Sequence, residues 1–298
     1  MRITGIEELT FGVDDIATSA KFCSDFGLER ISTDPEIFET RDGGRIILRP
    51  IDDPGLPKAI TEGPTLRELT WGVKDSAALD EIRAELEKDR QTTFDGKTLR
   101  SVDDIGLAIA FTVTARRAVE EPLPAVNVPG HIQRGVNRRI EVKKDIRPRG
   151  IAHVVLDCVD EPTARRFYID RLGFKVSDSF RDAGAFLRTS IQSEHHCLFT
   201  VKRDQTGLNH VAFYLTDFHE VMLGGAGMIE AGWATRWGPG RHRLGSNYFW
   251  YFNAPIGGAF EYTCDGDHVD DAWEPIELEF SRENSAIWST QYIAPPKH

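Results

Sequence analysis

Three side chains in the second half of the sequence are of the types that bind a divalent transition metal. His153 is the fourth residue of GIAHVV, His210 is the fourth residue of GLNHVAF, and Glu261 follows GGAF. Each run is apolar enough to form a strand, and strands hold ligands stiffly. Two imidazoles and one carboxylate leave neighbouring positions of an octahedral metal open, which is typical of non-haem iron(II) sites. The sequence therefore predicts one metal site on three strands.

Each of these residues also has a simpler interpretation when it is taken alone. A single His in a strand is more often a hydrogen-bonded core residue, and a Glu between Phe260 and Tyr262 could simply face water. The interpretation as ligands depends on their equivalent places in an internal repeat.

The repeat defines the elements that must position the ligands. Residues 5–32 (GIEELTFGVDDIATSAKFCSDFGLERIS) match residues 150–177 (GIAHVVLDCVDEPTARRFYIDRLGFKVS), and residues 64–82 match residues 206–222. Each copy has a strand, an acidic turn and an amphipathic helix, and polar hairpins follow. Four units of roughly βαβββ, two in each half, predict a duplicated α+β fold.

Local signals mark the ends of the predicted helices. Asp15, Asp75 and Asp217 stand where helices would begin, and Pro162 is suited to the first turn of the helix over 161–172. Gly27 and Gly173 follow two of the helices, where a residue with positive φ commonly ends them.

The sequence predicts two domains, at residues 1–140 and 141–298. The segment from Ala115 to about Arg149 shows no strand or helix period and carries several prolines, so it is interpreted as the connection. The first-half counterparts of His153, His210 and Glu261 are Glu8, Glu68 and a position near Ala110. The first domain is therefore expected to lack the metal, although a weak site at Glu8 and Glu68 stays open.

The run from Gly238 to Tyr262, GPGRHRLGSNYFWYFNAPIGGAFEY, carries the most specific pattern in the chain. It resembles the signature of the type I extradiol ring-cleaving dioxygenases of the vicinal oxygen chelate superfamily, in the branch of the dihydroxybiphenyl and catechol 2,3-dioxygenases. Trp250 departs from the aliphatic residue or Phe that is more usual there. The architecture of the whole chain fits this family, whose fold is built from tandem βαβββ modules. The matching positions are Gly240, His242, Tyr251, Pro255, Gly257 and Glu261.

The resemblance implies extradiol cleavage of a substituted catechol with molecular oxygen at one Fe(II), and Mn(II) would fit the same ligands. It assigns to His196 the role of the family's histidine that faces the bound oxygen and transfers protons. His195 would be its neighbour at the substrate. His242 and Tyr251 would hydrogen-bond the substrate oxygens. Without the motif, the His195–His196 pair could be an exposed pair at a strand start.

Pocket residues indicate the kind of catechol. Relatives that cleave homoprotocatechuate have an Arg and an Asn where this chain has Trp237 and Val155, so a more apolar pocket is expected here. Phe186, Phe249 and Trp233 could add aromatic walls or be ordinary core. Carboxylated catechols stay open because of three nearby arginines, Arg236, Arg241 and Arg243.

Composition limits the remaining possibilities. The chain of 298 residues has a net charge of −11, which disfavours binding to nucleic acid or to an anionic membrane. No apolar run reaches the about 18 residues of a membrane span, and the polar N-terminus does not resemble a secretory signal. Four separated cysteines are expected to be reduced thiols of a cytoplasmic protein. Family habit and exposed sheet edges favour a homo-oligomer, and the tail over 268–298 could be a lid or a surface wrap.

Two competing functions are kept. One is another enzyme of the same fold, a glyoxalase-type isomerase or an antibiotic-modifying transferase, which would usually have a more acidic metal set shared between half-sites. The other is a metal-free module that binds aromatic compounds, which has no need of His153, His210 and Glu261.

Overall fold

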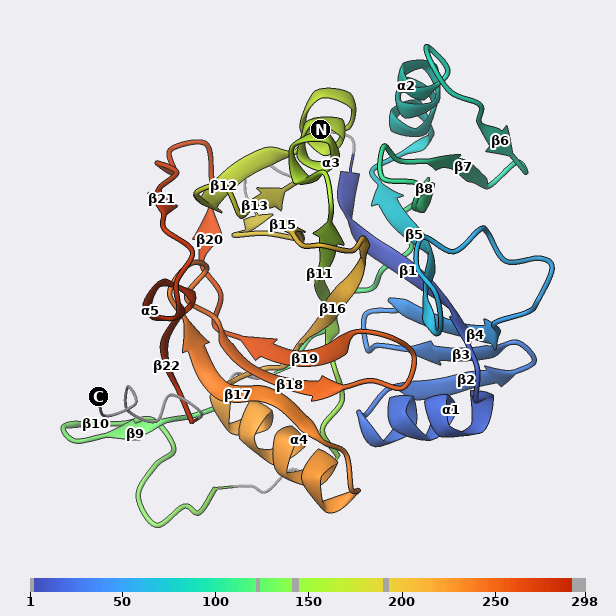
Figure 1. The fold of residues 1–298 in the computed structure, drawn as a ribbon. Helices are drawn as coiled ribbons and strands as arrows, with labels where there is room; N and C mark the ends of the chain where they lie inside the picture. The colour runs from blue at the N-terminus through green and yellow to red at the C-terminus, as the bar shows by residue number, and fades with distance from the viewer. Residues whose placement is uncertain (1–2, 122–123, 141–144, 190–192, 291–298) are drawn as a thin grey trace, which may run out of the picture.

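The structure, a computed structural model, describes residues 3–121, 124–140, 145–189 and 193–290. Its strands form one large curved sheet in each half of the chain, and the helices lie on the outside of the two sheets (Figure 1). This arrangement confirms the predicted α+β fold.

The first half contains an eight-stranded sheet in the order β2-β3-β4-β1-β5-β8-β7-β6. Helices α1 (Ile16–Asp25) and α2 (Ser76–Leu86) begin at the predicted caps, where the Asp15 and Asp75 side chains accept bonds from Thr18 and Ala78 main-chain N–H groups. The strands are β1 (Ile3–Val13), β2 (Glu29–Thr33), β3 (Glu36–Glu39), β4 (Arg45–Pro50), β5 (Thr65–Val73), β6 (Thr93–Phe94), β7 (Thr98–Val102) and β8 (Ala108–Val113).

The second half contains a ten-stranded sheet in the order β21-β12-β13-β15-β11-β16-β19-β18-β17-β22. Helix α4 (Phe218–Glu230) begins at the predicted cap Asp217. The first eight strands of this half that join the sheet are β11 (Gly150–Cys158), β12 (Lys175–Phe180), β13 (Gly184–Arg188), β15 (Leu198–Lys202), β16 (Gly207–Tyr214), β17 (Thr235–His242), β18 (Tyr248–Asn253) and β19 (Ala259–Cys264).

The helix predicted over 161–172 is divided in the structure. Helix α3 (Glu161–Arg166) continues as a π-helical turn, η1 (Phe167–Arg171), and Gly173 then adopts a φ of +78°. Apolar spacing predicts a helix but does not distinguish α-helical from π-helical bonding, so this change could not be predicted.

The strand register confirms the repeat residue by residue. His153 pairs with Ala212 as Glu8 pairs with Thr70, and Ala212 pairs with Glu261 as Thr70 pairs with Ala110. The pairing of His210 with Val155 likewise matches that of Glu68 with Thr10. Glu8, Glu68 and Ala110 are therefore the first-half counterparts of the three predicted ligands.

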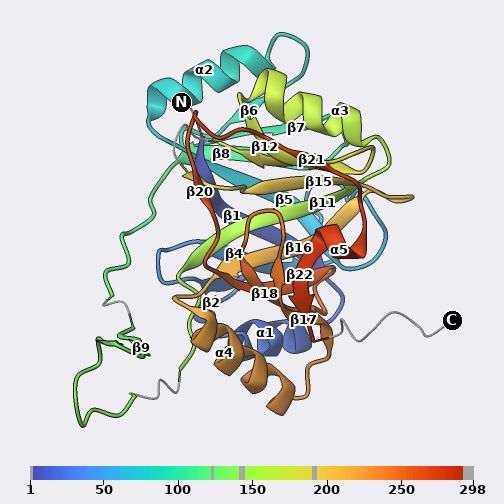
Figure 2. The ribbon, with the colours of Figure 1, turned by 90° about the vertical axis from the view of Figure 1, so that its left-hand side faces the viewer.

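Aromatic packing joins the two halves into one core. The Phe26 ring, after α1, stacks on Tyr262 of β19 with centroids 4.0 Å apart, and the Tyr262 hydroxyl donates to the Phe26 carbonyl oxygen. On the other side, the Tyr168 hydroxyl of η1 donates to buried Asp103 at 2.9 Å. Consequently α1 lies beside α4, and α2 lies beside α3, in both ribbon views (Figures 1 and 2).

The C-terminal tail extends the second sheet at both edges. Strand β21 (Glu277–Leu278) pairs with β12, and β22 (Ala286–Ser289) pairs with β17. Short helix α5 (Arg282–Ser285) connects them across the open side of the sheet (Figure 2). A further pair, β14 (Ser193–Glu194) with β20 (His268–Val269), fastens the start of the tail.

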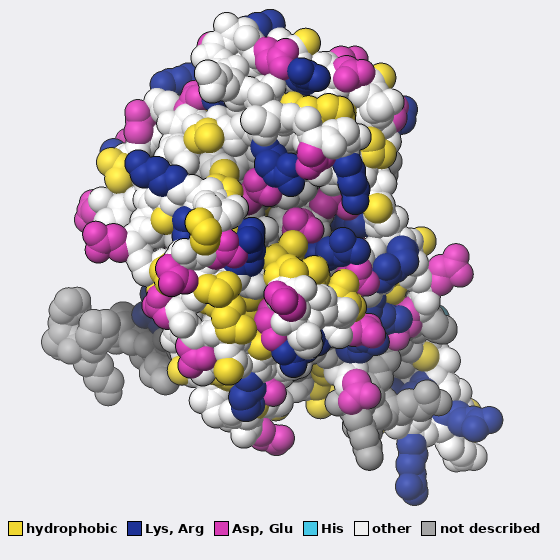
Figure 3. Space-filling view, turned by 90° about the vertical axis from the view of Figure 1, so that its right-hand side faces the viewer, with side chains coloured by type: hydrophobic (Ala, Val, Ile, Leu, Met, Phe, Trp, Pro, Cys, Tyr) yellow, Lys and Arg dark blue, Asp and Glu magenta, His cyan; other side chains and the backbone are white. Residues whose placement is uncertain are grey.

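The connecting segment over 115–149 carries a small hairpin, β9 (Asn127–Val128) with β10 (His131–Ile132). The division into domains at residues 1–140 and 141–298 remains our proposal. On the face of the first half shown in Figure 3, Lys and Arg side chains are interspersed with Asp and Glu. Within the described residues, no helix is long and apolar enough to span a membrane.

Candidate metal centre and active site

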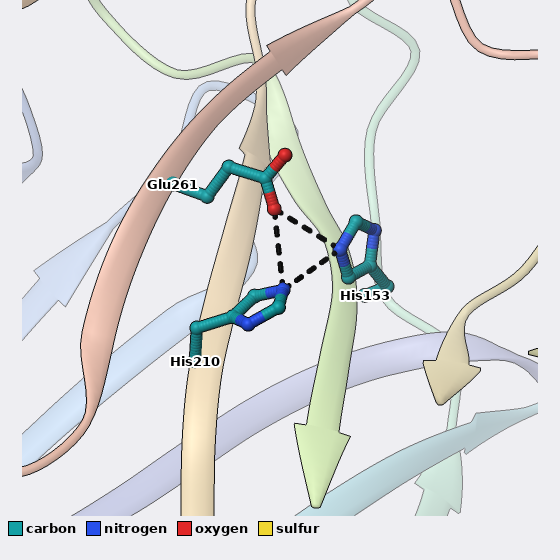
Figure 4. Close-up of side chains that lie close together, drawn as sticks. All are labelled: His153, His210 and Glu261. Atoms are coloured by element: carbon teal, nitrogen blue, oxygen red, sulfur yellow. Dashed lines mark hydrogen bonds and ion pairs between the residues drawn. The ribbon is translucent and has the colours of Figure 1, made fainter. Parts of the chain in front are cut away.

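The side chains of His153, His210 and Glu261 converge from β11, β16 and β19 (Figure 4). The two Nε2 atoms lie 3.3 Å apart, and each lies 3.2–3.3 Å from Oε2 of Glu261. All three residues are buried, and Glu261 has no exposed surface. The structure therefore brings the three predicted ligands together.

The geometry fits a shared cation. Donor atoms about 2.1 Å from a metal are about 3.0 Å apart in an octahedral and about 3.4 Å apart in a tetrahedral arrangement. The observed triangle lies between these values. Oε2 of Glu261 is buried and accepts no hydrogen bond of normal geometry within the described residues. A buried carboxylate oxygen without a hydrogen bond is unfavourable unless a cation satisfies it.

The electrostatics are consistent with this use of the residues. Burial raises the pKa of the Glu261 carboxyl, but the two imidazoles beside it outweigh this effect and hold that pKa well below its usual value. Burial lowers the pKa of His210 to about 4. His210 is therefore neutral near neutral pH, as a metal-binding imidazole must be.

Asn209 fixes which nitrogen of His210 faces the other ligands. Its Nδ2 donates to Asp157 at 2.9 Å, so its Oδ1 is left to accept from Nδ1 of His210, also at 2.9 Å. The lone pair of His210 is therefore on Nε2, the atom in the triangle.

A β-bulge makes this contact possible. Val155 pairs with His210 and Leu156 with Leu208, so Asn209 has no partner on β11. An extra residue in a strand re-aims neighbouring side chains, and here Asn209 and His210 reach one another although they are consecutive. Strict alternation would place them on opposite faces, so the contact of Asn209 could not be predicted from the sequence.

Asn247 is a second residue of the site that the sequence did not indicate. Its buried amide nitrogen lies 3.3 Å from Oε1 of Glu261 and 2.8 Å from Oγ1 of Thr263. It precedes β18 inside the recognised motif, but the motif itself assigns no role to this position.

His242 and Tyr251 form a hydrogen-bonded pair beside the triangle. The Ser285 carbonyl oxygen can only accept, so Nδ1 of His242 donates to it at 2.8 Å. Nε2 of the neutral ring then accepts from the Tyr251 hydroxyl, also at 2.8 Å. The Tyr251 ring packs edge-on against His210, with centroids 4.9 Å apart.

His196 lies on the other side of the triangle. Its ring centroid is 4.2 Å from that of His153, and burial lowers its pKa well below the usual value. His195 lies behind it, between His196 and Asp178. The pair is buried, so the alternative of an exposed pair is wrong.

A cavity of about 530 Å³ opens onto the triangle, and its volume suits a small aromatic molecule. Val155, Phe186 and Trp237 line it, as the sequence analysis expected. Further lining residues that the sequence did not indicate include Phe180, Phe199, Arg203, Leu244, Phe280 and Arg282. Part of the tail therefore lines the cavity, as expected of a lid.

Three residues that were candidates for the cavity wall or for substrate contact lie elsewhere. The Phe249 ring is covered by Trp237 and His242, at centroid distances of 4.3 and 4.1 Å, and it does not line the described part of the cavity. Trp233 packs edge-on against Phe22 of α1 instead. His195 is likewise separated from the cavity by His196.

Of the three arginines near the motif, Arg236 donates to the Asn209 carbonyl oxygen and Arg241 binds Asp265. The arginines that line the cavity are Arg203 and Arg282, one from the end of β15 and one from the tail.

The first-half counterpart of the site has a different composition. Arg100 occupies the position equivalent to Tyr251, and its Nε lies 3.3 Å from Oε2 of Glu68. The positive charge also acts on Glu8, whose pKa is raised chiefly by burial. The side chain of Arg100 thus supplies a cation beside the two acids, and the only metal-type cluster of His, Cys, Asp and Glu within the described residues is the triangle in the second half.

Comparisons with known proteins agree with this geometry. Metapyrocatechase 2 of Cupriavidus necator is 38% identical over 166 residues, which are 56% of this chain and 51% of that protein. The chain spans about half the length of the curated relatives it matches.

Several solved structures are similar to this chain over nearly its whole length. The Mn(II)-bound glyoxalase from Novosphingobium aromaticivorans has a TM-score of 0.78 and 25% identity, over 99% of this chain and 95% of its own. The 2,2',3-trihydroxybiphenyl 1,2-dioxygenase from Sphingomonas wittichii strain RW1 has a TM-score of 0.71 and 18% identity, over 96% and 98%. At that identity, the second likeness shows the fold alone.

The family assignment rests on the half of the chain that carries the triangle. The Glyoxalase/Bleomycin resistance protein/Dioxygenase superfamily matches residues 150–262, from the first residue of β11 to the residue after Glu261. This segment is similar to that superfamily, and an iron-dependent extradiol dioxygenase of Rhodococcus jostii is among the proteins to which the chain is similar, at 28% identity over 152 residues.

Proposed function

We propose that this protein cleaves the ring of a substituted catechol next to its diol, using O2 and one Fe²⁺ bound by His153, His210 and Glu261. The observation that carries the proposal is the convergence of these ligands at a largely apolar cavity that also presents His196, His242 and Tyr251. Similarity to a metapyrocatechase over 56% of the chain supports it.

Iron(II) is proposed because two histidines and one carboxylate leave adjacent coordination positions for other molecules. Mn²⁺ would fit the same ligands, and a solved relative binds Mn(II). When bound, the metal would offer neighbouring positions to the diol and to O2 and would carry electrons between them.

Tyr251 is suited to receive the diol. Because its hydroxyl donates to His242, the lone pairs of its oxygen remain for a hydrogen bond from a substrate hydroxyl. Burial raises the pKa of Tyr251 well above its usual value, so the phenol keeps its proton. Tyr251 adjoins His210 and His196 adjoins His153, so the two residues flank different ligands.

The cavity favours a substrate with an apolar substituent. Phe186 and Phe199 stack with centroids 4.1 Å apart, and Leu244 packs in the same apolar cluster. A ring with an alkyl or aryl group would bury its apolar surface there. Arg203 and Arg282 also line the cavity, so an acidic group at the end of such a substituent can be neutralised.

A glyoxalase-type isomerase is the second candidate, because the Mn(II)-bound glyoxalase matches the whole chain at a TM-score of 0.78. Such a reaction does not consume O2. Two observations favour the dioxygenase. All three ligands come from the second half of the chain, and the site also contains His196, His242 and Tyr251.

The deciding experiment starts from protein purified without oxygen and loaded with Fe²⁺. Catechols with alkyl, aryl and carboxyl substituents are then added in air, and oxygen uptake and absorbance are followed. We expect uptake of one O2 per catechol and a yellow product, with neither in His210→Ala. Iron-loaded protein that turns over no catechol overturns the proposal. Isomerisation of a 2-oxoaldehyde–thiol adduct without oxygen uptake would establish the second candidate, and catechol binding without any turnover would establish a binding module.

We also propose that the protein works in the cytoplasm and as a homo-oligomer. The buried or half-buried free cysteines support the first statement, and the open edges of the first sheet at β2 and β6 support the second. Light scattering of the purified chain tests the oligomer directly.

A further inference from the structure

Asp178 of β12 is buried behind the histidine pair and ends a continuous chain of hydrogen bonds. Its Oδ2 lies 2.8 Å from Nε2 of His195, and Nδ1 of His195 lies 3.1 Å from Nδ1 of His196. Asp178 and His195 are each only 2% exposed. These hydrogen bonds therefore connect a carboxylate in the protein interior to a histidine that lines the cavity.

The direction of each hydrogen bond follows from the carboxylate. An ionised carboxylate only accepts, so Nε2 of His195 carries a proton and donates it to Asp178. A neutral imidazole that donates from one ring nitrogen accepts at the other, so Nδ1 of His195 is then the acceptor. Nδ1 of His196 must be the donor in the bond between the two rings, which leaves the lone pair of His196 on Nε2.

We propose that Asp178 is a positioning residue of the active site, which acts through His195 to hold neutral His196 as the Nδ1–H tautomer with an unprotonated Nε2 toward the cavity. The inference rests on the proposed function, in which His196 accepts and returns a proton beside the metal. A nitrogen with a lone pair can do so, whereas an N–H group at the same place can only donate.

The tail fixes the orientation of Asp178. Its Oδ1 accepts a hydrogen bond of 2.8 Å from the main-chain N–H of Ile276. Asn at this position must therefore keep its oxygen toward Ile276 and turn its NH₂ group toward His195. The amide nitrogen would donate to Nε2 of His195, Nδ1 of His195 would donate to His196, and the proton of His196 would move to Nε2. The substitution Asp178→Asn is thus expected to exchange donor and acceptor in each hydrogen bond from residue 178 to His196, while the side chains keep their positions.

The tautomers can be read directly by NMR. The full-length chain is labelled with ¹⁵N-histidine, and long-range ¹H–¹⁵N spectra are recorded for the metal-free protein and for protein loaded with diamagnetic Zn²⁺. The chain has nine histidines, and His196 is assigned from the signals lost in His196→Gln. We expect Nδ1–H in the unsubstituted protein and Nε2–H in Asp178→Asn. Nε2–H in the unsubstituted protein, or an unchanged tautomer in the variant, overturns the inference.

Two further variants separate polarity from packing. In His195→Gln the amide must direct its nitrogen to Asp178 and its oxygen to His196, so His196 is expected to remain Nδ1–H. This variant keeps the test decisive if Asp178→Asn does not fold, because Nε2–H here would also overturn the inference. Asp103→Asn is the matched control, since Asp103 is also a buried carboxylate but accepts bonds from Tyr168 and Leu107, not from the histidine pair. It is expected to leave His196 unchanged.

Kinetics supply the second measurement. With a catechol that the protein cleaves, Asp178→Asn is expected to lower kcat by about 10²-fold and to change KM little, because the substrate contacts remain. Equal loss of metal content and activity would mean a structural role and would overturn the inference. The NMR result does not depend on turnover. If the variant shows the reversed tautomer but the protein cleaves no catechol, the proposed function is refuted, and the effect of Asp178 on the tautomer of His196 is still established.

Discussion

The main-chain carbonyl oxygen of Ser285 accepts a hydrogen bond of 2.8 Å from Nδ1 of His242, which connects α5 of the tail to β17 of the sheet. The same bond determines that Nε2 of His242 accepts from Tyr251. One carbonyl group of the tail thus determines which atom donates in a side-chain pair beside the proposed metal site.

Replacement of His242 should separate catalysis from metal binding. In His242→Gln the Tyr251 hydroxyl loses its imidazole acceptor, so kcat for a cleaved catechol is expected to fall by about 10²-fold. Metal content, measured by elemental analysis, should stay at one per chain because His242 is outside the triangle. Loss of metal as complete as in His210→Ala would contradict this prediction.

Removal of the Asn209 side chain should weaken the metal site without abolishing it. Asn209→Ala leaves Nδ1 of His210 without its acceptor, and loss of such a partner typically lowers metal affinity about 10–100-fold. Competition with a chelator measures the Kd. Asn253→Ala, at an exposed position of β18, is the matched control, and equal affinities of the two variants would refute the role of Asn209.

Enlargement of the apolar end of the cavity should change substrate preference. Phe199 is half-buried and stacks on Phe186, so Phe199→Ala is expected to raise kcat/KM for bulky catechols relative to unsubstituted catechol. The free energy of unfolding should fall by less than the about 3–5 kcal/mol typical of a fully buried Phe. If the ratio of kcat/KM for bulky catechols to kcat/KM for unsubstituted catechol does not change, the substituent does not bind beside Phe199 and the prediction is wrong.

Asp103 should make stability depend on pH. Burial raises the pKa of its carboxyl to about 6, against 3.8 for the ordinary group. The folded state therefore holds the proton more tightly, and the stability linked to it is present below about pH 4 and lost as the pH rises through about 6. Between about pH 4 and pH 6, the free energy of unfolding of the unsubstituted protein should fall by up to about 3 kcal/mol relative to that of Asp103→Asn. Urea unfolding at several pH values measures the difference, and a constant difference would contradict the prediction.

The first half should not add a second metal. Because Arg100 already pairs with Glu68, the double variant Glu8→Gln, Glu68→Gln is expected to keep one metal per chain. His153→Ala, measured beside it, should bind none with comparable affinity. A decrease in stoichiometry in the double variant would show a metal at the first-half site.

The fold and the three converging ligands could be predicted because they depend on patterns that repeat. Strand periods, the Asp caps and the register of two similar halves are all local or internal signals. The counterparts of His153 and His210 could be found by alignment of the chain with itself, and the strand pairing confirms them.

The residues that were missed depend on irregular or distant contacts. Asn209 requires a bulge, and Asp178 requires β12 and the tail to meet at Ile276. Phe249 was placed in the cavity wall because aromatic character alone does not show that Trp237 would cover it. Such contacts are set by tertiary packing, which composition and periodicity do not record.

The bulges have a consequence for protein engineering. Register shifts occur beside Glu8 and Glu68 in the first sheet at the same places as beside His153 and His210 in the second. The backbone irregularity is therefore a property of the duplicated frame and does not require a bound ion. A second metal centre could therefore be designed by substitution of side chains alone. Glu8 and Glu68 would become His, Ala110 would become Glu, and Arg100 would become a neutral residue. The main chain of the first half would not have to change.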